Sequence, residues 1–333
     1  MRAGVKSALK VLGGLLALVI LGPLLTGLIM KGLAPAVAPP GKLVDVGGHK
    51  LHIHCSGSLR GAPPVLIEAG LGLSSSYYHW IQVNLARSTK VCSYDRAGFG
   101  WSEPSKRSRE LGEVVEELHA LLDKAGFERP FVFAGHSIGA IIVREYAARY
   151  PGELAGLAFL DGSHPDQTRR LGLENLIKKE ELEQGVELYR LMVRTGLSRL
   201  YDPSLTLMKS EYPESVFAAL QYTSDGSYFD AVLAEYDGLV PLTDRARPRD
   251  DFGDKPTIVI QAGKTWDASE LPESVDPANI AAGWPELQKE TAALSTRGRY
   301  VVVDHATHMS LIYHEAYANQ AADFIRELLQ ATH

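Results

Sequence analysis

The chain has 333 residues, a formal net charge of −6, 45% hydrophobic residues and 22% charged residues. These proportions match those of globular proteins and exclude disordered, collagen-like and coiled-coil chains. The 40 acidic residues outnumber the 34 basic ones, so the sequence offers no basic surface and no nucleic-acid partner is expected. The two cysteines are too few for a disulfide-rich scaffold or a cysteine-based zinc site.

The beginning of the chain is predicted to be a membrane segment. Residues 11–30 form a run of 20 without a charged side chain, and three basic residues precede it. A membrane-spanning helix needs about 20 apolar residues, whereas the core of a signal peptide has roughly 7–15. We therefore expect an uncleaved anchor, with cleavage at the small-x-small site 34–36 as the alternative. Because the basic residues keep the N-terminus in the cytoplasm, the rest of the chain is expected to be extracytoplasmic: membrane-anchored or, after cleavage, secreted or periplasmic.

After a Pro/Gly-rich linker, β-rich runs alternate with helical patterns. The runs predicted as strands are Val44–Val46, Leu51–His54, Val65–Glu68, Val91–Tyr94, Phe131–Ala134, Leu157–Leu160, Thr257–Gln261 and Tyr300–Val303. The predicted helices are Glu113–Lys124, Ala140–Arg149 and Ala316–Leu329. This alternation is typical of an α/β fold, and it predicts a mostly parallel, eight-stranded sheet flanked by helices.

One long interval breaks the alternation between the sixth and seventh strands. It contains no evident strand, and helical, aromatic-rich segments dominate it. Such an insertion predicts a helical lid over the functional site. The expected organisation is a membrane or signal segment at 1–33, a linker at 34–42, a core at 43–164 and 252–333, and a lid at 165–251.

A short glycine-flanked serine motif carries the clearest chemical signal. The sequence GHSIG occupies residues 135–139, directly after an apolar strand and before a helical pattern. In that context the pattern predicts a nucleophile elbow, in which a tight turn projects the serine hydroxyl above the sheet. Nucleotide-binding folds also have glycine-rich strand–helix turns, but the sequence has neither a G-x-G-x-x-G motif nor a Walker lysine.

With this motif the chain resembles the α/β-hydrolase superfamily over residues 43–330. EAGLG at 68–72 stands where the family has its oxyanion loop, and DRAGFGWS at 95–102 resembles the family's turn after the fourth strand. DHATHM at 304–309 lies where the family places its histidine. The family usually has His-Gly where this chain has Glu-Ala, which is a departure in the outer wall of the oxyanion hole.

The resemblance implies a catalytic triad. Ser137 is the expected nucleophile, and because a serine hydroxyl needs an adjacent base, His308 is expected to supply one, with His305 as its rival. Asp161, after the sixth strand, is the expected acid, and Asp267, after the seventh, is the alternative. His136 is expected to be structural.

Main-chain groups are expected to complete the site. The backbone N–H groups of Leu71 and Ile138 are the predicted oxyanion hole. Asp95 and Arg96 are expected to brace the neighbouring turn rather than to react.

The fold that the resemblance implies also makes the second and fourth strands neighbours. Cys55 lies on the second and Cys92 on the fourth, so they are expected to form a disulfide, provided that the register fits. Such a bond agrees with an extracytoplasmic location.

The function expected from the resemblance is that of a serine hydrolase, esterase-like or lipase-like, which cleaves carboxylic esters through an acyl-enzyme. A small-molecule ester or lipid is the expected substrate, the N-terminal helix is the expected contact with the membrane, and neither a cofactor nor a metal is implied. An aminopeptidase or amidase of the same fold and a non-catalytic, hydrolase-like binding protein are the alternatives.

Overall fold

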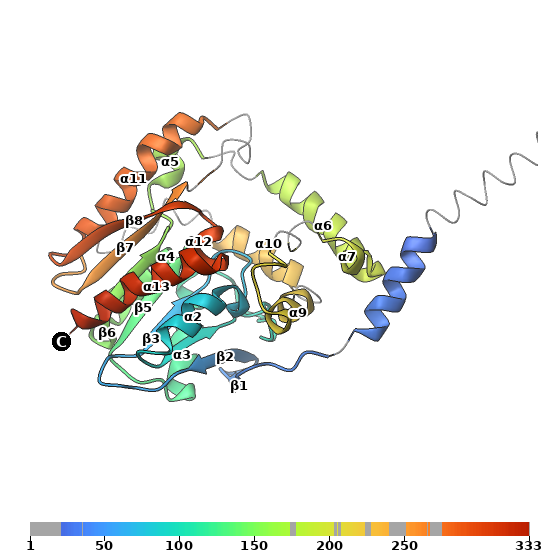
Figure 1. Cartoon of the computed structure of the whole chain (residues 1–333), viewed down its shortest axis with the longest axis horizontal. Coiled ribbons are helices and arrows are strands. Elements are labelled where there is room, and N and C mark those ends of the chain that lie inside the picture. Colours follow the sequence, from blue (N-terminus) through green and yellow to red (C-terminus); the bar gives the residue numbers. More distant parts are fainter. Residues whose placement is uncertain are drawn as a thin grey trace, which may run out of the picture.

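Eight strands form one sheet in the order β1-β2-β4-β3-β5-β6-β7-β8 in the computed structural model of the chain (Figure 1). β2 runs antiparallel to both of its neighbours, and every other pair is parallel. The predicted eight-stranded, mostly parallel sheet is therefore confirmed. The strands are β1 Lys42–Asp45, β2 Lys50–Ser56, β3 Val65–Glu68, β4 Val91–Tyr94, β5 Phe131–His136, β6 Leu154–Leu160, β7 Thr257–Lys264 and β8 Gly298–Thr307.

The structure describes most of the chain after its first 20 residues. The described residues are 21–34, 36–173, 178–202, 205, 208–223, 228–239, 251–264, 266 and 275–332.

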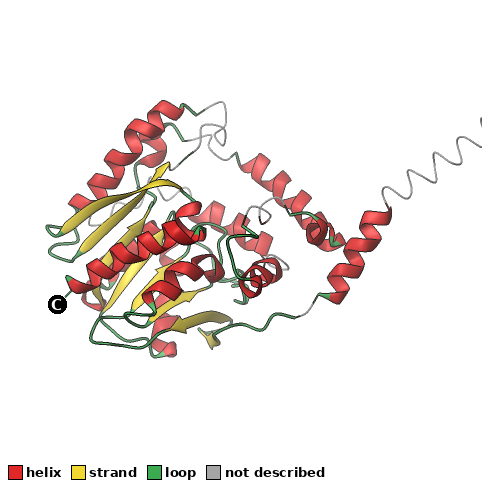
Figure 2. Cartoon of the chain, in the orientation of Figure 1, coloured by secondary structure: helices red, strands yellow, loops and turns green. Residues whose placement is uncertain are grey.

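Helices cover both faces of the sheet (Figure 2). α3 and α4 pack on one face, while α2 and α13 pack on the other. The helices of the sheet layers are α2 His79–Leu85, α3 Leu111–Ala125, α4 Gly139–Arg149, α11 Pro277–Ala293, α12 Ser310–Tyr313 and α13 Glu315–Gln330, with short 3-10 turns at η1 Ser75–Tyr78 and η2 Pro151–Glu153.

The central strand β5 shows how the sequence produces these two layers. Successive side chains of a strand point to opposite faces of the sheet. Phe131 and Phe133 accordingly belong to the core under α3 and α4, whereas Val132 and Ala134 belong to the core under α2 and α13. Because both faces are covered, the strand is apolar from Phe131 to Ala134 and does not alternate with polar residues there.

The interval between β6 and β7 is helical where it is described. It contains α5 Gln167–Leu171, α6 Lys179–Thr195, α7 Leu197–Leu200, α9 Glu214–Thr223 and α10 Tyr228–Leu239. Some of its aromatic residues pack with one another, as the sequence predicts: Tyr189 and Tyr228 lie against Phe229. The predicted role as a lid and the predicted domain boundaries stay predictions.

The predicted membrane segment lies largely outside the described residues, which begin at residue 21. Residues 21–33 form a helix beside α7 (Figure 1). Gly27 packs so closely that a Cβ there would lie 2.7 Å from the backbone carbonyl carbon of Gly196. The Nζ of Lys31 donates a hydrogen bond of 3.1 Å to the carbonyl oxygen of Val193. Within the described ranges, no helix is both long enough and apolar enough to span a bilayer.

The predicted disulfide is present, and it joins Cys55 to Cys92. The two residues stand directly opposite each other in the antiparallel register of β2 and β4. Cys92 is fully buried, while Cys55 is exposed. The bond therefore ties the antiparallel edge of the sheet to its parallel part.

Loss of this disulfide should destabilise the protein. Replacing both cysteines by alanine removes a cross-link between residues 37 positions apart in the chain. This should lower the free energy of unfolding by about 3–4 kcal/mol, because the unfolded chain gains conformational freedom. Urea unfolding of the parent and the double variant, each with and without reductant, measures this change. Reductant should weaken the parent and leave the variant unchanged; equal stability of the oxidised parent and the variant would refute the prediction.

Candidate active site

Ser137 occupies a strained turn between β5 and α4. Its φ of 54° lies in the left-handed region, which costs a non-glycine residue about 1–3 kcal/mol. Space explains the glycines on either side: a Cβ on Gly135 would lie 2.7 Å from the side chain of Val143, and one on Gly139 would lie 2.8 Å from the carbonyl oxygen of Ala69. The strand, the turn and the helix thus have the arrangement that the motif predicts.

His308 follows β8 and is held by Asp161, which follows β6. The Nδ1 atom of His308 lies 2.7 Å from Oδ2 of Asp161. Because Asp161 also accepts hydrogen bonds at Oδ1 from Trp284 (2.9 Å) and from the backbone N–H of Ala262 (3.2 Å), its carboxylate is fixed and fully buried. A carboxylate accepts, so Nδ1 carries the proton and Nε2 is left as the basic nitrogen.

The surroundings of His308 also orient its ring. The indole of Trp266 stacks on it, with ring centroids 5.3 Å apart and planes 13° apart. The ring centroid of His136, the residue before the serine, lies 4.7 Å from that of His308. Among the described residues the side chain of His308 bonds to Asp161 and not to Ser137; such hydrogen bonds are often long before substrate binds.

The structure distinguishes His308 from its sequence rival His305. His305 is exposed within β8, whereas His308 is paired with a buried carboxylate. Asp267, the alternative acid, lies outside the described residues.

Two backbone N–H groups beside the serine are available to a ligand. β3 and β5 pair in parallel with Glu68 opposite Gly135, so the loops after the two strands are adjacent. In the described structure, neither the N–H of Leu71 nor that of Ile138 donates a hydrogen bond. This is the arrangement that an oxyanion hole requires.

A chain of hydrogen bonds connects the oxyanion loop to the histidine loop. The N–H of Gly70 donates to the Tyr78 hydroxyl (2.8 Å), which lies 3.1 Å from Nδ1 of His136. Nε2 of His136 lies 3.2 Å from the carbonyl oxygen of His308. Burial holds the pKa of His136 well below its usual value, with a smaller contribution from His308. His136 is therefore neutral: Nε2 donates to that carbonyl, Nδ1 accepts from Tyr78, and its role is structural, as expected.

Asp95 and Arg96 brace the loops around the site, as the sequence suggests. Asp95 accepts from the backbone N–H of Ser75 (2.6 Å) and pairs with Nδ1 of His52 (2.7 Å). The more extensive role belongs to Arg96, whose side chain is 1% exposed. Its two terminal nitrogens donate to the carbonyl oxygens of Ala69 (2.7 Å) and Gly70 (2.8 Å), in the oxyanion loop itself.

Arg96 also fastens the helical insertion to this loop. It binds both carboxylate oxygens of Glu235 on α10, at 2.5 and 2.7 Å, and Oε1 of Glu68 at 2.7 Å. Burial raises the pKa of Glu68, although Arg96 and a hydrogen bond from Tyr94 oppose the shift. Glu68, which stands in the Glu-Ala departure from the family pattern, is thus part of a buried cluster. Sequence analysis missed Glu235, because a glutamate in an amphipathic helix gives no sign of burial.

Within the described ranges, no three His, Cys, Asp or Glu side chains converge as metal ligands.

Known proteins share this fold. Residues 63–181 match the family model for the α/β hydrolase fold. The uncharacterized protein YbdG of Bacillus subtilis (strain 168) is 30% identical over 129 residues, which are 38% of this chain and 39% of YbdG. An AB hydrolase superfamily protein of Gibberella zeae is 28% identical over 176 residues, 48% of this chain and 53% of that protein. The chain thus spans about half of these relatives or less.

Among solved structures, a thermophilic esterase from Thermogutta terrifontis superimposes with a TM-score of 0.60. It is 19% identical, and the match covers 88% of this chain and 98% of the esterase. At this identity the likeness shows a common fold. The chain thus has the α/β-hydrolase fold, as its sequence predicts.

The buried pair between Arg96 and Glu235 should be important for stability. Glu235→Gln keeps the shape but removes the charge, so it should lower the free energy of unfolding by about 2–3 kcal/mol. Glu116→Gln is the matched control, because Glu116 pairs with Arg149 at the surface and should change stability by about 0.5 kcal/mol or less. Urea unfolding compares the two variants. Equal effects would mean that this pair does not fasten α10 to the core.

Proposed function

We propose that this protein is a serine hydrolase that cleaves carboxylic esters through an acyl-enzyme intermediate. The observation that carries the proposal is the pairing of His308 with the buried Asp161 beside the strained elbow of Ser137. In this assignment Ser137 is the nucleophile, His308 the general base and Asp161 the orienting acid. The N–H groups of Leu71 and Ile138 form the oxyanion hole.

The mechanism follows from the protonation state of His308. Since Nδ1–H is bound to Asp161, Nε2 is free to take the proton of the serine hydroxyl as the oxygen attacks the ester carbonyl. The two N–H groups stabilise the negative charge that develops on the carbonyl oxygen. The tetrahedral intermediate then collapses, and the imidazolium gives its proton to the departing alcohol. In the second half of the reaction, His308 takes a proton from water as the water attacks the acyl-enzyme, and Ser137 leaves with a proton from the imidazolium, which releases the acid.

The contacts of the carboxylate favour Asp161 over Asp267 as the acid. Asp161 is fully buried, accepts two further hydrogen bonds and points one oxygen at His308. Those bonds stabilise the ionised form that holds an imidazolium during the reaction.

An ester substrate is supported by two considerations. The site contains the groups that acyl transfer needs, and the structural neighbour from Thermogutta terrifontis is described as an esterase. The helical insertion between β6 and β7 is proposed as the lid over this substrate. An extracytoplasmic location also remains part of the proposal, and the Cys55–Cys92 disulfide supports it.

Three substitutions test the triad. With p-nitrophenyl butyrate as substrate, Ser137→Ala should reduce kcat to background, because no other group can form the acyl-enzyme. Asp161→Asn should lower kcat by roughly 10³–10⁴-fold, since the amide cannot stabilise the imidazolium or enforce its tautomer. Asp267→Asn, the matched control, should stay close to the parent.

Labelling with a fluorophosphonate separates the remaining outcomes. If the parent protein is labelled at Ser137 but does not cleave the ester, the serine is reactive and the substrate is a different acyl compound. A parent that neither labels nor hydrolyses would contradict the enzymatic proposal. A larger loss from Asp267→Asn than from Asp161→Asn would overturn the choice of acid.

A further inference from the structure

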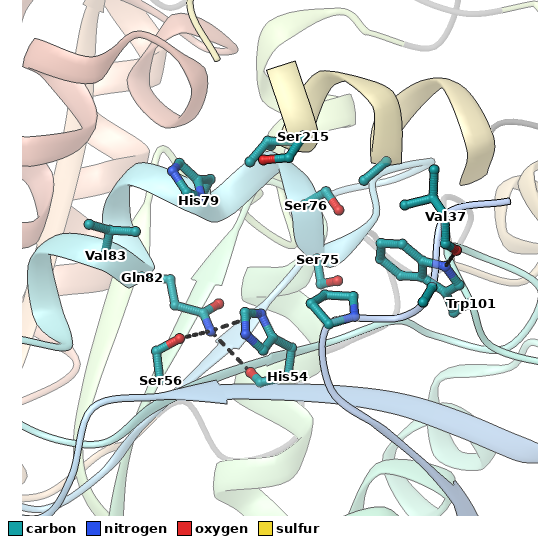
Figure 3. Close-up of a pocket in the computed structure, with 14 residues that line it drawn as sticks. Val37, His54, Ser56, Ser75, Ser76, His79, Gln82, Val83, Trp101 and Ser215 are labelled. Carbon is teal, nitrogen blue, oxygen red and sulfur yellow. Dashed lines mark hydrogen bonds between the residues drawn. The ribbon is translucent and has the colours of Figure 1, made fainter. Parts of the chain in front are cut away.

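A partly open cavity lies apart from the proposed catalytic residues. It has a volume of about 340 Å³ and is lined by residues of β2, η1, α2 and α9, by Trp101 and by the linker that precedes β1 (Figure 3). Ser137, His308 and Asp161 are not among the residues that line it. The volume falls in the range of small-molecule sites, about 300–1,000 Å³.

One wall of the cavity carries fixed polar groups. Nε2 of Gln82 donates to Ser56 Oγ (3.2 Å) and to the carbonyl oxygen of His54 (3.1 Å), and it lies 3.3 Å from Nδ1 of His54 (Figure 3). The amide nitrogen of Gln82 has two hydrogens to share among these three neighbours. In its neutral form, the ring of His54 has one N–H donor and one acceptor nitrogen.

Further polar side chains along the cavity have unused hydrogen-bonding groups. Within the part of the chain that the structure describes, the side chains of Ser75, Ser76 and His79 form no hydrogen bond. Polar groups in such positions are normally satisfied by water or a ligand. Each serine hydroxyl can donate and accept, and a neutral imidazole has one donor and one acceptor.

The cavity is also electrically neutral. The described residues that line it include no Asp, Glu, Lys or Arg. Burial lowers the pKa of both His54 and His79, with smaller contributions from neighbouring groups, so both imidazoles are neutral at pH 7. A charged ligand would lose hydration on entering the cavity and would find no opposite charge there, so its desolvation would cost free energy.

Apolar side chains also line the cavity. They include Val83, Val216 and Trp101, together with the linker residue Val37. The indole N–H of Trp101 donates to the carbonyl oxygen of Val37 (3.1 Å), so the linker is fastened as a wall of the cavity. A ligand that fits must therefore combine a hydrocarbon part with a hydrogen-bonding edge.

We propose that this cavity is a binding site for a small neutral alcohol. The hydroxyl would meet the imidazole of His54 and the hydroxyls of Ser75 and Ser76, while the hydrocarbon part contacts Trp101 and the valines. A hydroxyl fits better than a carbonyl because the cavity presents both donors and acceptors. The site does not depend on the proposed esterase activity, since it shares none of the assigned catalytic residues.

Fluorescence quenching tests the proposal on the full-length Ser137→Ala protein, in which hydrolysis plays no part. The probe is 6-bromohexan-1-ol, whose bromine quenches nearby tryptophans such as Trp101. Saturable quenching is expected. The matched anion, 6-bromohexanoate at pH 8, should bind at least roughly tenfold more weakly, because its carboxylate loses water in an uncharged cavity.

Substitutions then locate the binding. Ser76→Phe and Ser215→Phe fill the cavity from η1 and from α9, and each should weaken binding of the alcohol by roughly tenfold or more. Ser108→Phe is the control: Ser108 is exposed and does not line the cavity, so this variant should bind as the parent does. Thermal unfolding identifies variants that fold, and either cavity variant suffices.

Three results would overturn the proposal. They are an absence of saturable quenching by the alcohol, carboxylate binding as tight as that of the alcohol, and unchanged alcohol binding in the folded cavity variants. Because the protein lacks the nucleophile, failure of the esterase proposal leaves this test intact, and the reverse is also true.

Discussion

The parallel pairing of β3, β5 and β6 is the constraint on which the site depends. Parallel strands end at the same edge of a sheet, so the loops that follow them meet there. Glu68 stands opposite Gly135, and His136 opposite Leu160. A shift of one residue in either register would turn every side chain to the other face and separate the serine from its partners. β5 buries the large Phe131 and Phe133 on one face and the smaller Val132 and Ala134 on the other, so a shift would exchange large and small side chains between the two cores. The packing of the core thus also positions the site.

This arrangement holds two residues in backbone conformations that they would otherwise avoid. Ser137 and Asp161 have φ values of 54° and 44°. The N–H of Ser137 donates to the carbonyl oxygen of Leu160 (3.2 Å), and that of Asp161 to the carbonyl oxygen of Ile260 (2.7 Å). Each strained residue is thus bonded to the backbone of the neighbouring strand. Strain of this kind persists only where the surroundings fix the conformation, and here the neighbouring strands β6 and β7 do so.

Local patterns made much of this predictable from sequence. The apolar runs marked the strands, and the glycines around Ser137 marked the turn because their reason is steric and local. The pairing of Cys55 with Cys92 followed once the strand order was assumed. The choice between Asp161 and Asp267 did not follow, because it depends on which loop turns its carboxylate toward His308, and spacing along the chain does not determine that direction. The neutral cavity around His54 and His79 was missed for a related reason: its walls come from segments far apart in sequence.

The buried cluster around Arg96 shows a deeper limit of sequence patterns. Glu68 stands out as an exception to the family motif, but its partner Glu235 comes from the insertion, 139 residues beyond Arg96 in the chain. An unpaired charge in this core would be costly, so Glu68, Arg96 and Glu235 are interdependent. The same guanidinium holds the carbonyl oxygens of Ala69 and Gly70, which orients the peptide that leads to Leu71. The position of α10 and the geometry of the oxyanion loop are therefore linked through one side chain, and the departure from His-Gly is part of that link.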